Sequence, residues 1–98
     1  MRDPEILAEV KATLALLTQR SPGRAIEVRI PPYAAVQCGA GPTHTRGTPA
    51  NVIEMDASTW LALASGERSW AEAMASGAIN ASGVRADLTE LLPLRMEP

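Results

Sequence analysis

The stretch from Asp56 to Gly83 reads DASTWLALASGERSWAEAMASGAINASG, and its capping and stop residues decide the predicted fold. Asp56 can accept hydrogen bonds from the free amides of a first helical turn, so it predicts a helix start. Trp60 and Leu63 lie within that helix. Gly66 predicts its end, because glycine adopts the left-handed conformation that stops a helix without strain.

A second short helix is predicted directly after the first. Ser69 and Glu72 have the spacing of a capping box, in which each side chain accepts a hydrogen bond from the backbone amide of the other residue. Gly77 predicts the end of this helix, and the alternation over residues 78–82 predicts a strand. Helices that lead into a strand in this way are typical of a mixed α and β protein.

Upstream of this stretch, the chain predicts one amphipathic helix over residues 4–18. Asp3 followed by Pro4 is typical of a helix start, and the sequence Ser-Pro-Gly at residues 21–23 ends the pattern. The apolar residues recur at a spacing of three or four, which places them on one face. They are Ile6, Leu7, Val10, Leu14 and Leu17.

Strands are predicted between the long helix and the two short ones. Apolar and polar residues alternate from Ile26 to Ile30 and again from Tyr33 to Cys38. Pro31-Pro32 interrupts the alternation, so we expect a hairpin around the prolines, with one edge strand broken by a bulge as the alternative. Residues 51–55 predict a third strand. Residues 39–49, GAGPTHTRGTP, predict a loop or a wide hairpin connection.

The element order predicts an α+β fold with a four- to five-stranded, mostly antiparallel or mixed sheet and helices packed on one face. Residues 87–92 predict a final helical turn or two before Pro93. The direct connections at residues 31–32 and 39–49 suit antiparallel pairing, whereas the two helices before the fourth strand are long enough for a crossover. A chain of 98 residues predicts a single domain over residues 1–98.

Composition argues against several classes of partner. The formal net charge is -2 and no run of like charge stands out, so we expect no nucleic-acid partner. No apolar stretch approaches the roughly 18 residues of a membrane span, so we expect no stable membrane insertion. The single cysteine and the lack of a secretory leader pattern predict a cytoplasmic protein.

Residues that could carry chemistry are few. His44 is the only histidine, and no set of residues has the spacing of a metal site, so we expect no metal, no cofactor and no enzyme activity. Cys38 is expected to be a small buried residue. His44, Thr45 and Arg46 are the contact candidates of the 39–49 loop, which could clamp an anion. The alternative is that hydrogen bonds between side chains and backbone within the loop fix its conformation, and that Arg46 pairs with a carboxylate such as Glu54.

The most concentrated apolar surface is predicted on the two short helices and the C-terminal stretch. One interpretation is that these residues form the core. The other is that part of the surface lines a hydrophobic cavity, because the intervening alanines leave room. The residues are Trp60, Leu63, Trp70, Met74, Leu88, Leu91 and Leu92.

The segment over residues 56–83 resembles the signature region of the sterol carrier protein type 2 fold. The shared order is an aspartate cap, a Trp/Leu helix, a glycine turn, a second short helix ending in Ser-Gly, and a strand ending in glycine. The preceding PPYAAVQCGAGPTHTRGTPANVIE is similar to a small bacterial branch of that family, found in high-GC Gram-positive bacteria. The resemblance spans about residues 10–94.

The resemblance implies a five-stranded sheet with helices on one face. It also implies an apolar tunnel between the two layers, which in eukaryotic relatives binds fatty acyl chains, acyl-CoA or sterols. This chain departs from the pattern in having no Phe, in carrying Val84-Arg85 where many members have an acidic residue, and in its short stretch from Leu88 to Leu94.

Two functions therefore stand as hypotheses. The first is a small non-catalytic protein that binds lipid or another apolar ligand, fatty acyl or sterol-like, in a cavity between sheet and helices. The alternative is an accessory protein–protein interaction module whose core is filled by its own side chains and whose contact surface is the 39–49 loop. A homodimer or another protein partner is compatible with either hypothesis.

Overall fold

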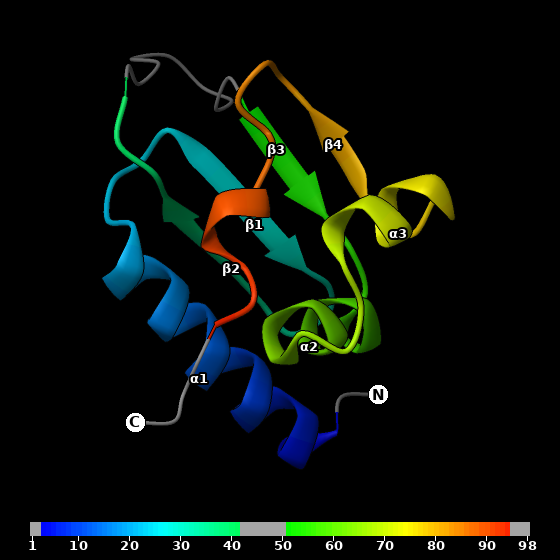
Figure 1. The fold of residues 1–98 in the computed structure, drawn as a ribbon. Helices are drawn as coiled ribbons and strands as arrows, with labels where there is room; N and C mark the ends of the chain where they lie inside the picture. The colour runs from blue at the N-terminus through cyan, green and yellow to red at the C-terminus, as the bar shows by residue number, and fades with distance from the viewer. Residues whose placement is uncertain (1–2, 42–50, 95–98) are drawn as a thin grey trace.

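The computed structural model describes residues 3–41 and 51–94, where one sheet is covered by helices on one side (Figure 1). The predicted α+β class is confirmed. The helices are α1 (Pro4–Arg20), α2 (Ala57–Ser65) and α3 (Trp70–Ala75), with a 3₁₀ turn at Thr89–Leu91. The strands are β1 (Ile26–Ile30), β2 (Ala34–Cys38), β3 (Asn51–Glu54) and β4 (Asn80–Ser82).

The sheet is mixed and has the strand order β2-β1-β3-β4. Strand β2 runs antiparallel to β1, with Val28 opposite Val36, so the predicted hairpin around the prolines is confirmed. Strand β3 runs parallel to β1, with Val28 opposite Ile53, and β4 runs antiparallel to β3. The described residues form four strands, rather than the five that the resemblance implies.

Two predicted connections were wrong. Residues 39–49 were expected to join antiparallel neighbours, but β3 lies beside β1 and parallel to it. Cys38 at the end of β2 and Asn51 at the start of β3 both lie beside Ile26, the first residue of β1. The two helices after β3 were expected to allow a crossover, but β4 lies antiparallel beside β3, so they return the chain at the end where β3 finished.

Helix ends follow the predicted caps. The Asp3 carboxylate accepts a hydrogen bond from the Glu5 amide at 2.8 Å, and the Asp56 carboxylate accepts one from the Thr59 amide at 2.8 Å. Ser69 and Glu72 form the predicted capping box at the start of α3. Gly66 ends α2 with a φ of 88°, as the left-handed stop requires.

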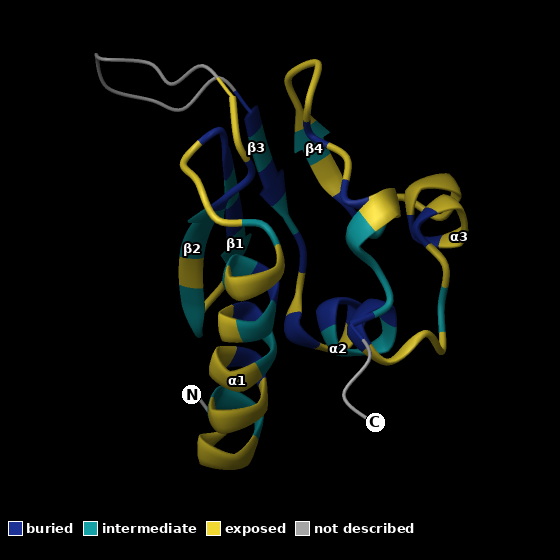
Figure 2. Cartoon of the chain, turned by 60° about the vertical axis from the view of Figure 1, so that its left-hand side comes forward, coloured by how far each residue is buried: buried dark blue, intermediate teal, exposed yellow. Residues whose placement is uncertain are grey.

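The two faces of the sheet have different surroundings. Ile26, Val28 and Ile30 are buried on the face that α1 and α2 cover, whereas Glu27 and Arg29 alternate onto the opposite face. Figure 2 shows that no described helix lies against this second face. The Arg29 Nε and a Glu27 carboxylate oxygen are 2.7 Å apart there, which neutralises a pair of charges at the surface.

The closing segment, which we define as residues 84–94, lies over the sheet between α1 and α2 (Figure 1). A final helical turn or two was predicted over residues 87–92, and Thr89–Leu91 form a single turn of the 3₁₀ type. The Asp87 carboxylate accepts a hydrogen bond from the Thr89 amide, two residues later, which makes a turn rather than a helix cap. Pro93 follows too soon for an α-helix to develop.

Candidate functional site

The candidate site is the apolar interior between the sheet and the helical layer. Of the predicted residues, Trp60, Leu63 and Leu88 are fully buried and belong to one core cluster. Trp70 is also buried in that cluster. The structure therefore brings together residues from α2, from the first turn of α3 and from the closing segment.

The remaining predicted residues lie further out. Leu91 and Leu92 are half-buried and pack against the core cluster from the closing segment. Met74 is 43% exposed on α3, so the structure does not bring it together with the other predicted residues. The loop candidates His44, Thr45 and Arg46 lie outside the described residues.

One partly buried polar contact orients Trp60, the largest side chain of the interior. The Trp60 Nε1 donates a hydrogen bond to the Thr13 Oγ1 at 2.7 Å, which joins α2 to α1. The Thr13 hydroxyl in turn donates to the Glu9 carbonyl, one turn back in α1, at 2.7 Å. Because the indole N–H has a partner inside the protein, Trp60 is satisfied while fully buried.

Half-buried apolar side chains surround the buried ones along the helical layer. We call them the apolar fringe: Leu16 on α1, Leu61 on α2, and Leu91 and Leu92 on the closing segment. All four pack against the core cluster while part of each side chain stays exposed, so apolar groups in contact with the interior are accessible at the surface. Sequence reasoning missed Leu16 and Leu61 as site residues, although both lie at the edge of a helical apolar stripe.

Arg20 is a third residue that sequence reasoning missed. Its Nη1 donates hydrogen bonds to the Leu91 carbonyl at 2.9 Å and to the Pro93 carbonyl at 3.2 Å. These contacts join the last residue of α1 to the closing segment across more than 70 positions of sequence. No local pattern could have shown this pairing, because an arginine near a helix C-terminus is also favoured by the helix dipole.

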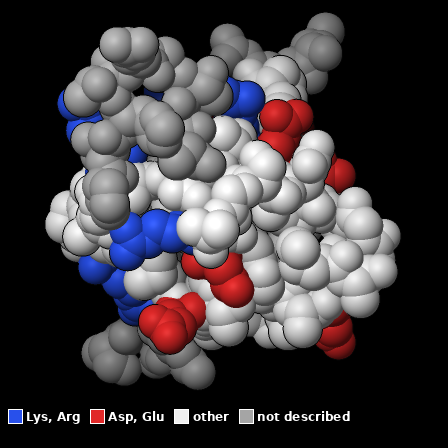
Figure 3. All heavy atoms as spheres, turned by 90° about the horizontal axis from the view of Figure 1, so that it is seen from above, with Lys and Arg blue, Asp and Glu red and all other residues white. Residues whose placement is uncertain are grey.

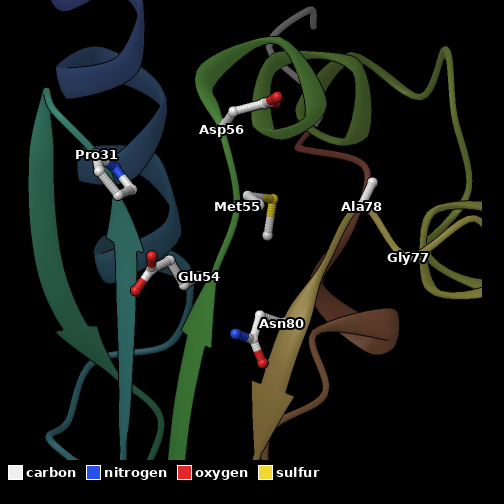
Figure 4. A pocket seen from close by; sticks show the side chains of 7 residues that line it. All are labelled: Pro31, Glu54, Met55, Asp56, Gly77, Ala78 and Asn80. Atoms are coloured by element: carbon white, nitrogen blue, oxygen red, sulfur yellow. The ribbon is translucent and has the colours of Figure 1, made fainter.

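A separate pocket of about 240 Å³ lies where β1, β3 and β4 meet the start of α2 (Figure 4). Its lining residues are Pro31, Glu54, Met55, Asp56, Gly77, Ala78 and Asn80. None of the predicted site residues lines it, and its volume is below the roughly 300–1,000 Å³ of typical small-molecule sites. The hydrogen bond from the Thr59 amide lowers the pKa of Asp56, which holds that carboxylate ionised at the rim.

The thiol of the one cysteine is withdrawn from solvent. Cys38 is fully buried, as expected, and burial raises the pKa of its thiol, which disfavours the nucleophilic thiolate. Within residues 3–41 and 51–94, no three side chains of the His, Cys, Asp and Glu types are placed to share a metal ion. In the same ranges no helix has the length and apolar character needed to cross a bilayer.

Charged side chains are sparse on the end of the molecule seen in Figure 3. Basic groups lie mainly on one side of this view, and acidic groups lie near its centre and on the opposite rim. The surface between them is largely uncharged.

Comparison with known protein families agrees with this architecture. A family described as bacterial SCP ortholog matches residues 3–94 of the chain. The chain belongs to this bacterial sterol-carrier-protein-like family. The match covers α1, the whole sheet and the closing segment, so the SCP-like assignment extends to every described element. No curated protein matches the SCP-like chain.

Proposed function

We propose that the chain is a non-catalytic binding protein for an apolar small molecule of the fatty acyl or sterol-like class. The observation that supports the proposal is the apolar fringe, whose side chains pack against the buried interior from α1, α2 and the closing segment and are still partly exposed. Membership of the SCP-like family supports the same ligand class. The ligand would lie between the sheet and the helices, beside Trp60 and Leu63.

The strength of such binding follows from apolar burial. Each buried methylene contributes about 0.8 kcal/mol, so a chain of about sixteen methylenes gains roughly 13 kcal/mol, of which roughly 8 kcal/mol remains after about 5 kcal/mol of association costs. A long acyl chain would then bind with a dissociation constant near the micromolar range. The raised pKa of the Cys38 thiol and the small number of other reactive groups support a carrier rather than an enzyme. We propose that the protein acts in the cytoplasm. The free, buried thiol of Cys38 supports this location, because thiols stay reduced there.

The test is native mass spectrometry of the freshly purified protein, followed by titration with the fluorescent fatty acid cis-parinaric acid. We expect a bound mass that leaves on denaturation and saturable uptake of the probe. Absence of both would overturn the proposal.

Two matched variants locate the site. Leu92→Asn places an amide on the apolar fringe and should weaken binding of the probe by about tenfold, because an unpaired amide opposes an acyl chain. Val84→Asn is the control, since Val84 is fully exposed, at 101%, and lies outside the fringe. Equal binding by the two variants would place the ligand elsewhere.

A further inference from the structure

The closing segment packs Leu88, Leu91 and Leu92 into or against the core, but it makes few hydrogen bonds to the rest of the described structure. At its start, the Arg85 amide donates to the Asn51 Oδ1 at 2.9 Å. At its end, the Leu94 amide donates to the Ala64 carbonyl of α2 at 2.8 Å. None of its residues pairs with a strand of the sheet.

Within itself, the closing segment is well organised. The Leu91 amide donates to the Leu88 carbonyl at 2.9 Å, and the Asp87 carboxylate accepts a hydrogen bond from the Thr89 amide at 2.8 Å. A stretch with internal hydrogen bonds and few external ones is expected to detach as one unit rather than residue by residue.

The centre of the segment covers the interior. Leu88 is fully buried and shares the core cluster with Trp60 and Leu63. Detachment of the segment would remove Leu88 from this cluster and expose the apolar surface beneath it. The only side chain of α1 that is seen to hydrogen-bond the segment in the described structure is Arg20, through the carbonyls of Leu91 and Pro93.

We propose that the closing segment opens as a unit to admit the apolar ligand, and that Arg20 is the latch that holds it shut. The statement that the segment opens to admit a ligand rests on the proposed function. Arg20 suits a latch because it is exposed on the last turn of α1, so its two bonds can break and reform without disturbing the core. The two acceptors are neutral carbonyls. Breaking the hydrogen bonds to the guanidinium therefore leaves no unpaired charge buried in the protein.

The test compares Arg20→Met with Arg24→Met in the full chain. Methionine keeps an apolar stem and removes the donors. Arg24 is a matched exposed arginine whose Nε donates to the Gln37 Oε1 at 3.2 Å, away from the closing segment. The readout is amide hydrogen exchange at Leu94 in the segment and at Val28 in the sheet.

For Arg20→Met we expect the protection of the Leu94 amide to fall about tenfold, with that of Val28 unchanged. Arg24→Met should leave both unchanged. Unaltered protection of Leu94 in Arg20→Met would overturn the latch. An equal loss at Leu94 and Val28 would also overturn it, because Arg20 would then support the whole fold.

Uptake of cis-parinaric acid by stopped flow then tests the gating role. Faster uptake by Arg20→Met than by Arg24→Met supports the proposal, and equal rates despite an opened segment overturn it. If Leu94 loses protection but neither the wild type nor any variant takes up the probe, opening stands and the proposed lipid binding fails. The two readouts thus separate failure of the latch from failure of the function.

Discussion

At the scale of single residues, short-range hydrogen bonds decide where the helices start, and Asp56 gives the most direct test. The Thr59 amide lowers the pKa of Asp56 below its ordinary value of 3.8, because the bond favours the ionised carboxylate. A carboxylate with a lowered pKa in the folded state stabilises the protein above its unfolded pKa. That stabilisation is lost as the pH falls through the folded pKa.

We therefore predict that Asp56→Ala lowers the free energy of unfolding by about 1 kcal/mol at pH 7. The gap between wild type and variant should shrink as the pH is lowered below about 3.8, where the carboxylate of the unfolded chain protonates, and should be lost as the pH falls through the lower folded pKa. Urea unfolding at pH 7 and at pH 2.5 measures the gap. Asp56→Asn, which keeps an acceptor oxygen but does not titrate, is the control. A gap that is the same at both pH values would contradict the role of the charge.

At the scale of elements, the end of α2 is the place where the closing segment is seated. Gly66 has a φ of 88°, and a Cβ added there would lie 3.3 Å from the Pro93 Cβ. Gly77 has a similar φ of 80°, but a Cβ added there would meet nothing within 4 Å. An alanine at either position would therefore have the same backbone strain. Only at Gly66 would it also crowd the closing segment.

We predict that Gly77→Ala lowers the free energy of unfolding by about 1–2 kcal/mol, the cost of a left-handed alanine. Gly66→Ala should cost more than Gly77→Ala, because it adds the crowding against Pro93. Thermal unfolding of the two variants measures the difference, and hydrogen exchange at Leu94 should show reduced protection in Gly66→Ala alone. Equal losses of unfolding free energy in the two variants would show that Pro93 moves aside without an energetic cost.

Elements were predictable where their causes are local. The caps at Asp3, Asp56 and Ser69 each act within three residues, so the sequence pattern was enough to place the helices. The hairpin around Pro31-Pro32 was also predictable, because its strands are neighbours in sequence. The partner of β3 was not, since the choice between β1 and β2 depends on which sheet edge the helices leave free.

The candidate site was predictable only in part, for the same reason. Trp60, Leu63 and Leu88 were identified from their apolar character and helical spacing, and the structure buries all three together. The contact of Arg20 with Leu91 joins residues 71 positions apart, and no periodicity reports such a pair. Met74 has the composition of a core residue, but α3 is so short that its outer side remains in solvent.

At the scale of the whole molecule, Asn51 links three segments that are distant in sequence. Its Nδ2 donates to the Ala25 carbonyl at 2.9 Å before β1, and its Oδ1 accepts from the Arg85 amide at 2.9 Å in the closing segment. The side chain is buried at the start of β3, where an unpaired backbone group would be costly.

We predict that Asn51→Leu lowers the free energy of unfolding by at least about 2 kcal/mol, because it leaves the Ala25 carbonyl and the Arg85 amide without partners. Asn80→Leu, an exposed change on β4, should alter it by no more than about 0.5 kcal/mol. Urea titration measures both variants, and an unchanged dependence on urea concentration would show that the unfolded states are comparable. Equal losses would mean that the links through Asn51 are not stabilising.

The parallel pairing of β1 with β3 has a consequence for the kinetics of folding. The β1–β2 hairpin joins residues close in sequence, and such hairpins form in roughly 1–10 μs. The β1–β3 pair forms only after the chain between residues 30 and 51 has closed a large loop, which raises the contact order and slows the reaction. We therefore expect mutations in the hairpin to act on an early step and mutations in β3 to act on the rate-limiting one.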